Sequence, residues 1–161
     1  MLNLPFFKQE TDYYCGPAVL QMILQFYGQT LSQTELAQIA GTTSTGTSPT
    51  RLLEAAQTLG LQTKVIEPAT ISELKSLIDE GLPVVVNFTE PESNFFGHYA
   101  IAVNYDATWL YLQDPDSDVG PQTKYDWIDF DQRWHDHDDG NHPTNHWLAV
   151  FSKSKQTPFK Q

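Results

Sequence analysis

Residues 9–18 read QETDYYCGPA, and this segment decides the fold that we expect. Cys15 begins an amphipathic stretch, and Gly28 is placed to end it as a helix. The apolar residues that recur at helical spacing are Val19, Met22, Ile23 and Phe26. Pro17 suits the first helical turn, where a backbone N–H has no partner within the helix. The sequence therefore predicts a helix that begins at the cysteine.

Three more helices are predicted between this first helix and the middle of the chain. Ser32 with Glu35, and Thr70 with Glu73, have the spacing of a capping box, which marks a helix N-terminus. Another helix follows Pro49. We place the three helices at about residues 32–40, 49–59 and 70–80, each ended by a glycine or a glycine-rich loop.

The second half of the chain has the pattern of strands. The expected strands are 62–66, 83–88, 98–105, 109–113 and 147–152, with a hairpin turn at 106–108. The Asp-rich stretch that follows Asp114 and Pro115 is interpreted as a polar loop. Helices followed by an antiparallel sheet indicate an α+β fold. We expect one domain over residues 1–161, with a polar tail at 153–161.

Composition narrows the classes of partner. The chain has 161 residues, of which 40% are hydrophobic, and a formal net charge of −11. A chain with this much negative charge is not expected to bind nucleic acid or an anionic membrane surface, because both require clustered Lys and Arg. No apolar run is long enough to cross a membrane, and residues 1–8 lack the features of a signal peptide. We therefore expect a cytoplasmic protein, of an oligomeric state that the sequence does not indicate.

The chain has one cysteine, so no intrachain disulfide is possible. Cys15 is either a small core residue or a reactive thiol. Its place at a helix N-terminus favours the thiolate, because the free N–H groups and the helix dipole stabilise negative charge there. Gly16 adds no side chain beside the sulfur, which leaves room for a substrate carbonyl.

A candidate base lies at the start of the 98–105 strand. His98 follows Gly97 and can face a cleft, where an imidazole can accept the thiol proton. If this strand pairs with 109–114 around the turn, Asp114 falls opposite His98 or within one residue of it. A carboxylate there would orient the ring and stabilise the imidazolium. The alternatives are an ordinary strand-end histidine and a turn aspartate before proline.

Gln9 precedes the cysteine by six residues. Its side-chain amide could donate to the oxyanion of a tetrahedral intermediate, beside the backbone N–H of Cys15. Taken alone, it would be interpreted as a surface glutamine.

Together these motifs resemble the C39 peptidases and the broader C39-like group. The resemblance rests on Gln9, on DYYCGPA at 12–18, on GHYA at 97–100 and on Asp114 with Pro115, in that order along the chain. It implies a papain-like fold with Cys15 as nucleophile, His98 as base, Asp114 as orienting residue and Gln9 as oxyanion donor. The best-known members are domains of ABC transporters that cut bacteriocin leader peptides after a Gly-Gly pair.

The resulting expectation is a stand-alone C39-like thiol peptidase. It would cleave a peptide or related amide through a thioacyl intermediate on Cys15, without a cofactor or a bound metal. We expect Gly16, Gly97 and Phe96 to contact the substrate. Two alternatives use the same fold: a catalytically idle peptide-binding module, and an acyl transferase with the same Cys-His-Asp triad.

A second stretch rich in His and Asp lies near the C-terminus. It contains His135, His137, His142 and His146, together with Asp136, Asp138 and Asp139. Such a set could bind a transition metal or calcium. Because its spacing fits no standard zinc pattern, we interpret it as a solvated acidic loop before the last strand.

Overall fold

The first third of the chain forms helices, as the sequence predicts. In the computed structural model, which describes residues 2–90, 97–116, 122–136 and 143–153, helix α1 is Cys15–Phe26, α2 is Gln33–Ala40 and α3 is Pro49–Thr58. Both expected capping boxes are present, Ser32 with Glu35 before α2 and Thr70 with Glu73 before α4, Ile71–Asp79. Gly28 follows α1 with φ of 93°, a left-handed conformation that glycine adopts without strain.

A six-stranded antiparallel sheet follows the helices. Its order is β1-β8-β2-β3-β4-β5. The strands are β1 Leu61–Ile66, β2 Val84–Thr89, β3 Gly97–Tyr105, β4 Trp109–Gln113, β5 Gln122–Asp126 and β8 Leu148–Lys153. The last strand of the sequence thus lies inside the sheet, between β1 and β2.

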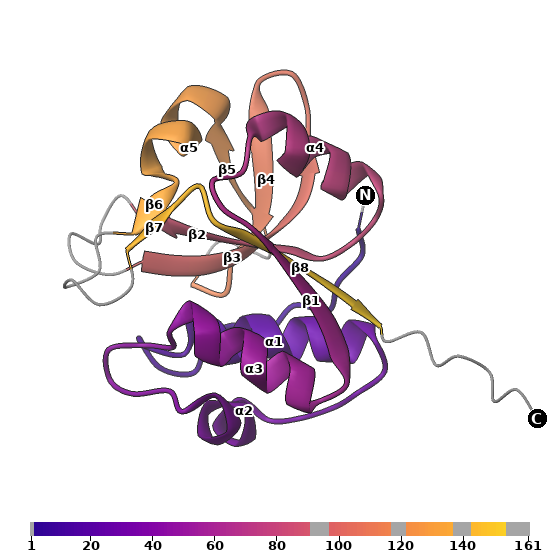
Figure 1. Ribbon diagram of the computed structural model, residues 1–161, viewed down its shortest axis with the longest axis vertical. Helices are drawn as coiled ribbons and strands as arrows, with labels where there is room; N and C mark the ends of the chain where they lie inside the picture. Colours follow the sequence, from indigo (N-terminus) through magenta and orange to yellow (C-terminus); the bar gives the residue numbers. More distant parts are fainter. Residues whose placement is uncertain (1, 91–96, 117–121, 137–142, 154–161) are drawn as a thin grey trace, which may run out of the picture.

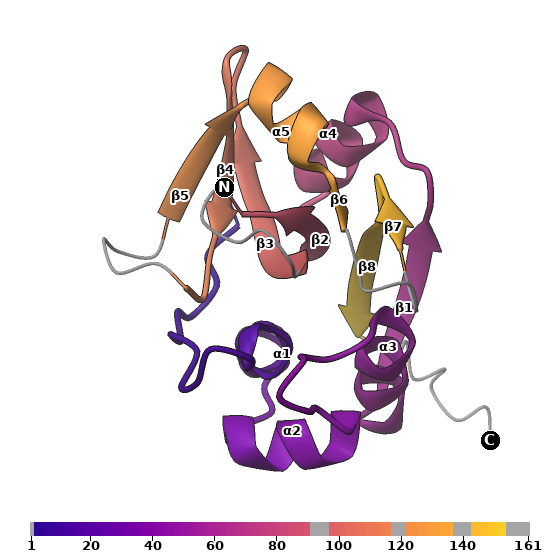
Figure 2. The ribbon, with the colours of Figure 1, turned by 90° about the vertical axis from the view of Figure 1, so that its left-hand side faces the viewer.

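Alternation along the strands divides the core between the two faces of the sheet. In β3, Ile101 and Val103 pack with α1–α3, whereas Ala100 and Ala102 pack on the opposite side with Phe130. Phe130 belongs to α5, Trp127–Arg133. Figures 1 and 2 show α1, α2 and α3 on one side of the sheet, and α4 and α5 on the other. This arrangement confirms the expected α+β fold. Within the described ranges, no helix combines the length and apolar character that crossing a membrane requires.

The stretch after Pro115 is more ordered than the sequence indicated. The structure forms β5, α5 and a two-stranded sheet of β6 (His135–Asp136) with β7 (Thr144–Asn145), where we expected a polar loop. That expectation was wrong because β5 is an edge strand of mostly polar residues, and because α5 has only 7 residues. Asp126 caps α5 through a bond from the backbone N–H of Asp129, so part of the acidic composition serves helix capping.

The β3–β4 hairpin has a different register from the one expected. Tyr105 pairs with Leu110 across a wider turn, and Ile101 pairs with Gln113 after a β-bulge between Ala102 and Asn104. Continuing this ladder places Asp114 beside Ala100, two residues from His98. The expected direct opposition is therefore wrong. Diagonal neighbours on one face of an antiparallel pair still come within reach of each other.

Candidate active site

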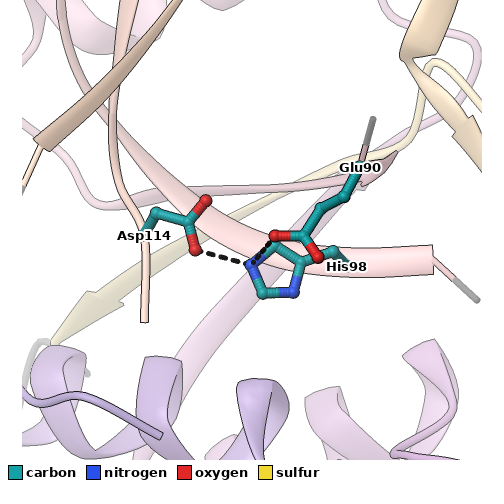
Figure 3. A group of neighbouring side chains, drawn as sticks. All are labelled: Glu90, His98 and Asp114. Carbon is teal, nitrogen blue, oxygen red and sulfur yellow. Dashed lines mark hydrogen bonds and ion pairs between the residues drawn. The ribbon is translucent and has the colours of Figure 1, made fainter. Parts of the chain in front are cut away.

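His98 and Asp114 form a short hydrogen bond at the end of the sheet. The distance from His98 Nε2 to Asp114 Oδ1 is 2.6 Å, and the two residues are only 5% and 3% exposed. Asp114 Oδ1 also accepts a bond of 2.9 Å from the backbone N–H of Asp116. A carboxylate held in this way accepts the Nε2 proton, which leaves Nδ1 as the second ring nitrogen. Figure 3 shows that nitrogen turned away from Asp114.

Cys15 lies at the first residue of α1, which packs against β3. The thiol is buried, with 8% of the residue exposed, and it is near enough to His98 to contribute to the raised pKa of the imidazole. The first turn of α1 contains no acidic residue that would oppose a negative charge. Burial lowers the pKa of His98, but the hydrogen bonds with Asp114 and Cys15 and their charges raise it well above the usual value. The structure thus brings Cys15, His98 and Asp114 into one buried chain of contacts.

Gly16 packs against the loop before α3. A Cβ at this position would lie 2.7 Å from Oγ1 of Thr47, and the Thr47 carbonyl accepts a bond of 2.8 Å from the Tyr99 hydroxyl. Close packing therefore explains the glycine, because any larger residue would displace this loop. A contact between Gly16 and substrate stays a prediction.

Gln9 is held next to the Asp114-Pro115 segment. Its backbone N–H donates to the Pro115 carbonyl at 2.9 Å, and its side-chain Nε2 donates to the Thr11 carbonyl at 2.9 Å. Gln9 Oε1 is buried and has no hydrogen-bond partner among the residues that the structure describes. The oxyanion role stays a prediction.

A buried glutamine on α2, which sequence reasoning missed, fixes the backbone on both sides of Gln9. Gln33 donates from Nε2 to the Lys8 carbonyl at 2.8 Å, and its Oε1 accepts from the backbone N–H of Glu10 at 2.9 Å. An isolated Gln within a helix gives no indication of this role in the sequence.

Glu90 is a second residue that sequence reasoning missed. It follows β2, in which Phe88 pairs with His98, so Glu90 is the next residue along β2 on the same face. Its Oε1 lies 3.2 Å from His98 Nε2, and its side chain is 21% exposed. Burial raises the pKa of Glu90 to about 7, opposed by His98 and reinforced by Asp114 and Asp116. The pairing of strand 83–88 with strand 98–105 could have revealed it.

The ligand atoms of Glu90, His98 and Asp114 lie within 4.8 Å of one another, the one such group among the residues that the structure describes. Carboxylate and imidazole groups can ligate a divalent ion, and the 2.6 Å contact between His98 and Asp114 has the length of a charge-assisted hydrogen bond.

The His- and Asp-rich stretch near the C-terminus, for which metal binding was the less favoured interpretation, is partly described. His146 bonds to Asn145 at 2.8 Å and to Asp131 at 2.9 Å, which gives it a structural explanation. His135 lies in β6. Four of its members, His137, Asp138, Asp139 and His142, lie outside the described residues, and so does the predicted substrate contact Phe96.

Gly97, the other predicted substrate contact, lies against β6. A Cβ at Gly97 would collide with the carboxylate of Asp136 and would lie 2.7 Å from Asn87 Oδ1. The glycine is therefore explained by the close approach of this side chain. Its contact with a substrate stays a prediction.

The sequence and the fold are similar to known peptidase domains. The model of the Peptidase C39 like family matches residues 1–139. The mesentericin transport/processing ATP-binding protein MesD of Leuconostoc mesenteroides is 28% identical over 141 residues, which are 83% of this chain and 19% of that protein. The chain thus spans about a fifth of the length of this transporter.

Solved structures show the same fold. The peptidase domain of Streptococcus ComA, a bi-functional ABC transporter, superposes with a TM-score of 0.75 at 24% identity, over 95% of this chain and 99% of that one. A double glycine motif protease from an AMS/PCAT transporter, solved in complex with the leader peptide, superposes with a TM-score of 0.70 at 20% identity, over 94% and 93%. By the family match and this fold, the chain belongs to the Peptidase C39 like family.

Proposed function

We propose that this protein is a thiol peptidase that cleaves a peptide or a related amide through a thioacyl intermediate on Cys15. The observation that supports the proposal most is the buried chain of contacts from Cys15 through His98 to Asp114. It contains the three parts that thiol catalysis requires: a nucleophile at a helix N-terminus, a base within hydrogen-bond reach and a carboxylate that orients the base.

In the first half-reaction the Cys15 thiolate attacks the carbonyl carbon of the scissile amide. Negative charge develops on the carbonyl oxygen, where the Cys15 backbone N–H and the Gln9 amide would donate hydrogen bonds. His98 then gives a proton to the departing amine as the C–N bond breaks, which leaves an acyl thioester on Cys15. Asp114 accepts the Nε2 hydrogen, so in this proposal Nδ1 is the ring nitrogen that exchanges a proton with Cys15 and the leaving group.

In the second half-reaction the thioester is released. His98 accepts a proton from a water molecule, the resulting hydroxide adds to the thioester carbonyl, and the Cys15 thiolate departs. An amine in place of water would give acyl transfer on the same residues. Because the solved double glycine motif protease was crystallised with a leader peptide, we include peptides with a Gly-Gly pair among the substrates to be tested.

The test is incubation of the protein with a peptide that contains a Gly-Gly pair, a matched peptide with Ala-Ala in its place, and a mixed peptide library. Mass spectrometry would detect the products and a covalent acyl adduct on Cys15. We expect cleavage by the unmodified protein and none by Cys15→Ala, which keeps the fold because it removes one sulfur from a small buried site. Equal cleavage by both proteins would overturn the proposal.

Two controls separate the alternatives. Hydroxylamine added to the reaction traps an acyl thioester as a hydroxamate, so the ratio of hydroxamate to free acid measures acyl transfer against hydrolysis. If the protein binds a peptide by calorimetry but never cuts or acylates, it is a binding module on this fold and the peptidase proposal is wrong.

A further inference from the structure

Two carboxylates from different strands meet the same nitrogen of His98. Asp114, after β4, lies 2.6 Å from Nε2, and Glu90, after β2, lies 3.2 Å from it. Figure 3 shows both carboxylates joined to the same ring nitrogen, from different directions. A triad needs one orienting carboxylate, so Glu90 requires a separate explanation.

We propose that Glu90 is a second positioning carboxylate for His98, which shares the Nε2 proton with Asp114 and keeps the ring charged towards alkaline pH. This inference rests on the proposed peptidase function and deepens it. Glu90 acts through His98 and does not touch the substrate in the proposal.

The backbone holds Glu90 at this place from two directions. Phe88 pairs with His98 across β2 and β3, and the rings of these two residues pack edge to face with centroids 5.6 Å apart. The Thr89 hydroxyl donates to the His135 carbonyl at 2.7 Å, which ties the end of β2 to β6. Glu90, the next residue, is therefore placed by strand pairing on one side and by this hydrogen bond on the other.

The charged surroundings of Glu90 are mostly negative. His98 lies on β3, Asp114 and Asp116 follow β4, and all three act on the ionisation of Glu90. Burial, and then the negative charges of Asp114 and Glu90, raise the pKa of the Tyr125 hydroxyl on β5. The neighbouring elements also carry Asp129 and Arg133 of α5, which pair with each other, and His135 and Asp136 of β6. His98 is therefore the positive partner nearest to Glu90.

In this environment the charge of the Glu90 carboxyl depends on the pH. Because burial raises the pKa of Glu90 to about 7, the carboxyl is neutral in acid and ionised in mild alkali. At acidic pH a neutral Glu90 adds no charge to the cluster. At alkaline pH the ionised group gives the imidazolium a second anion beside Asp114, so His98 loses its proton at a higher pH than Asp114 alone would allow. The contribution of Glu90 is thus confined to the alkaline side.

The experiment is an NMR titration of the His98 ring in the unmodified protein and in Glu90→Gln, with the resonance assigned from His98→Gln. Glu90→Gln keeps the shape and the acceptor oxygen but never ionises. We expect the pKa of His98 to fall by about one unit, at the low end of the effect of a nearby opposite charge because Glu90 is partly exposed. Glu80→Gln is the matched control, because Glu80 is an exposed carboxylate at the end of α4.

The activity profile adds a readout that a purely structural role would not change. If peptides are cleaved, Glu90→Gln should lower the pH at which kcat/KM declines in alkali and leave the acid limb unchanged. If Glu90→Gln shifts the pKa of His98 no more than Glu80→Gln does, the inference is overturned, whether or not the protein cleaves peptides. A lowered pKa of His98 in a protein that cuts no peptide would support the positioning role and refute the peptidase proposal, so the two failures are distinguishable.

Discussion

Glu90→Gln should make the folded protein more stable at neutral and alkaline pH. The unfolded chain exposes Glu90 to water, where its pKa has the ordinary value of 4.5, whereas burial raises the pKa to about 7 in the folded protein. An acid with a raised pKa holds its proton more tightly in the folded state. The folded protein is therefore favoured in acid, and it loses stability as the pH rises from about 4.5 to about 7.

The magnitude follows from the two pKa values. Their difference of about 2.5, at about 1.36 kcal/mol for each pKa unit, corresponds to about 3 kcal/mol lost above pH 7. At about pH 5 the cost is about 1 kcal/mol, because most of the titration window still lies above that pH. Gln cannot ionise, so the variant avoids this cost at every pH. The side chain of Glu90 is 21% exposed, so solvent screening leaves most of the penalty in place.

The assay is urea denaturation of both proteins at about pH 5 and about pH 8. We expect the variant to exceed the unmodified protein by about 1 kcal/mol at the lower pH and about 3 kcal/mol at the higher one. The lower His98 pKa expected in the variant removes at most about 1.4 kcal/mol of imidazolium stabilisation for one pKa unit, so the gap at the higher pH shrinks towards about 2 kcal/mol but still exceeds the gap at the lower pH. Glu80→Gln controls for the change in net charge. A gap that stays the same at both pH values would refute the reasoning, because only a group that titrates between them makes the gap grow.

Two further substitutions test the site. Asp114→Asn keeps an acceptor for His98 but removes the negative charge, so kcat should fall by about 10²-fold or more while KM changes little. Initial rates of peptide cleavage at several substrate concentrations measure both constants, and an unchanged kcat would contradict the orienting role. Gly97→Ala would force a methyl group against the Asp136 carboxylate, so the free energy of unfolding should fall by about 1–3 kcal/mol. Urea denaturation checks that value, and an unchanged midpoint would mean that Asp136 moves away without cost.

Local rules account for the parts of the fold that the sequence predicts well. The capping boxes of α2 and α4 are made by residues three positions apart, so they are visible without any tertiary knowledge. The apolar run of β2 is equally visible, because both faces of that strand are buried. Cys15 and His98 stand out in the sequence as candidates because each lies in a local motif, and the structure puts each at the start of an element.

The missed features depend on contacts between distant parts of the chain. β5 is polar because it is an edge strand, and its existence follows from pairing with β4 rather than from its own pattern. The hairpin register depended on a bulge at 102–104, which no residue there indicates by type. Glu90 reaches His98 only through the pairing of β2 with β3. A single sequence cannot rank such pairings, because each requires the rest of the sheet.

The position of β8 links completion of the sheet to the order in which the chain is synthesised. Cys15, Glu90, His98 and Asp114 have all been made once residue 114 is added, but β1 and β2 are joined only by β8, Leu148–Lys153. Until those residues leave the ribosome, β1 has no neighbour in the sheet and one edge of β2 is open. The β2–β3–β4 part of the sheet, which carries His98 and borders Glu90 and Asp114, can therefore pair before β8 is made, whereas β1 joins the sheet only afterwards.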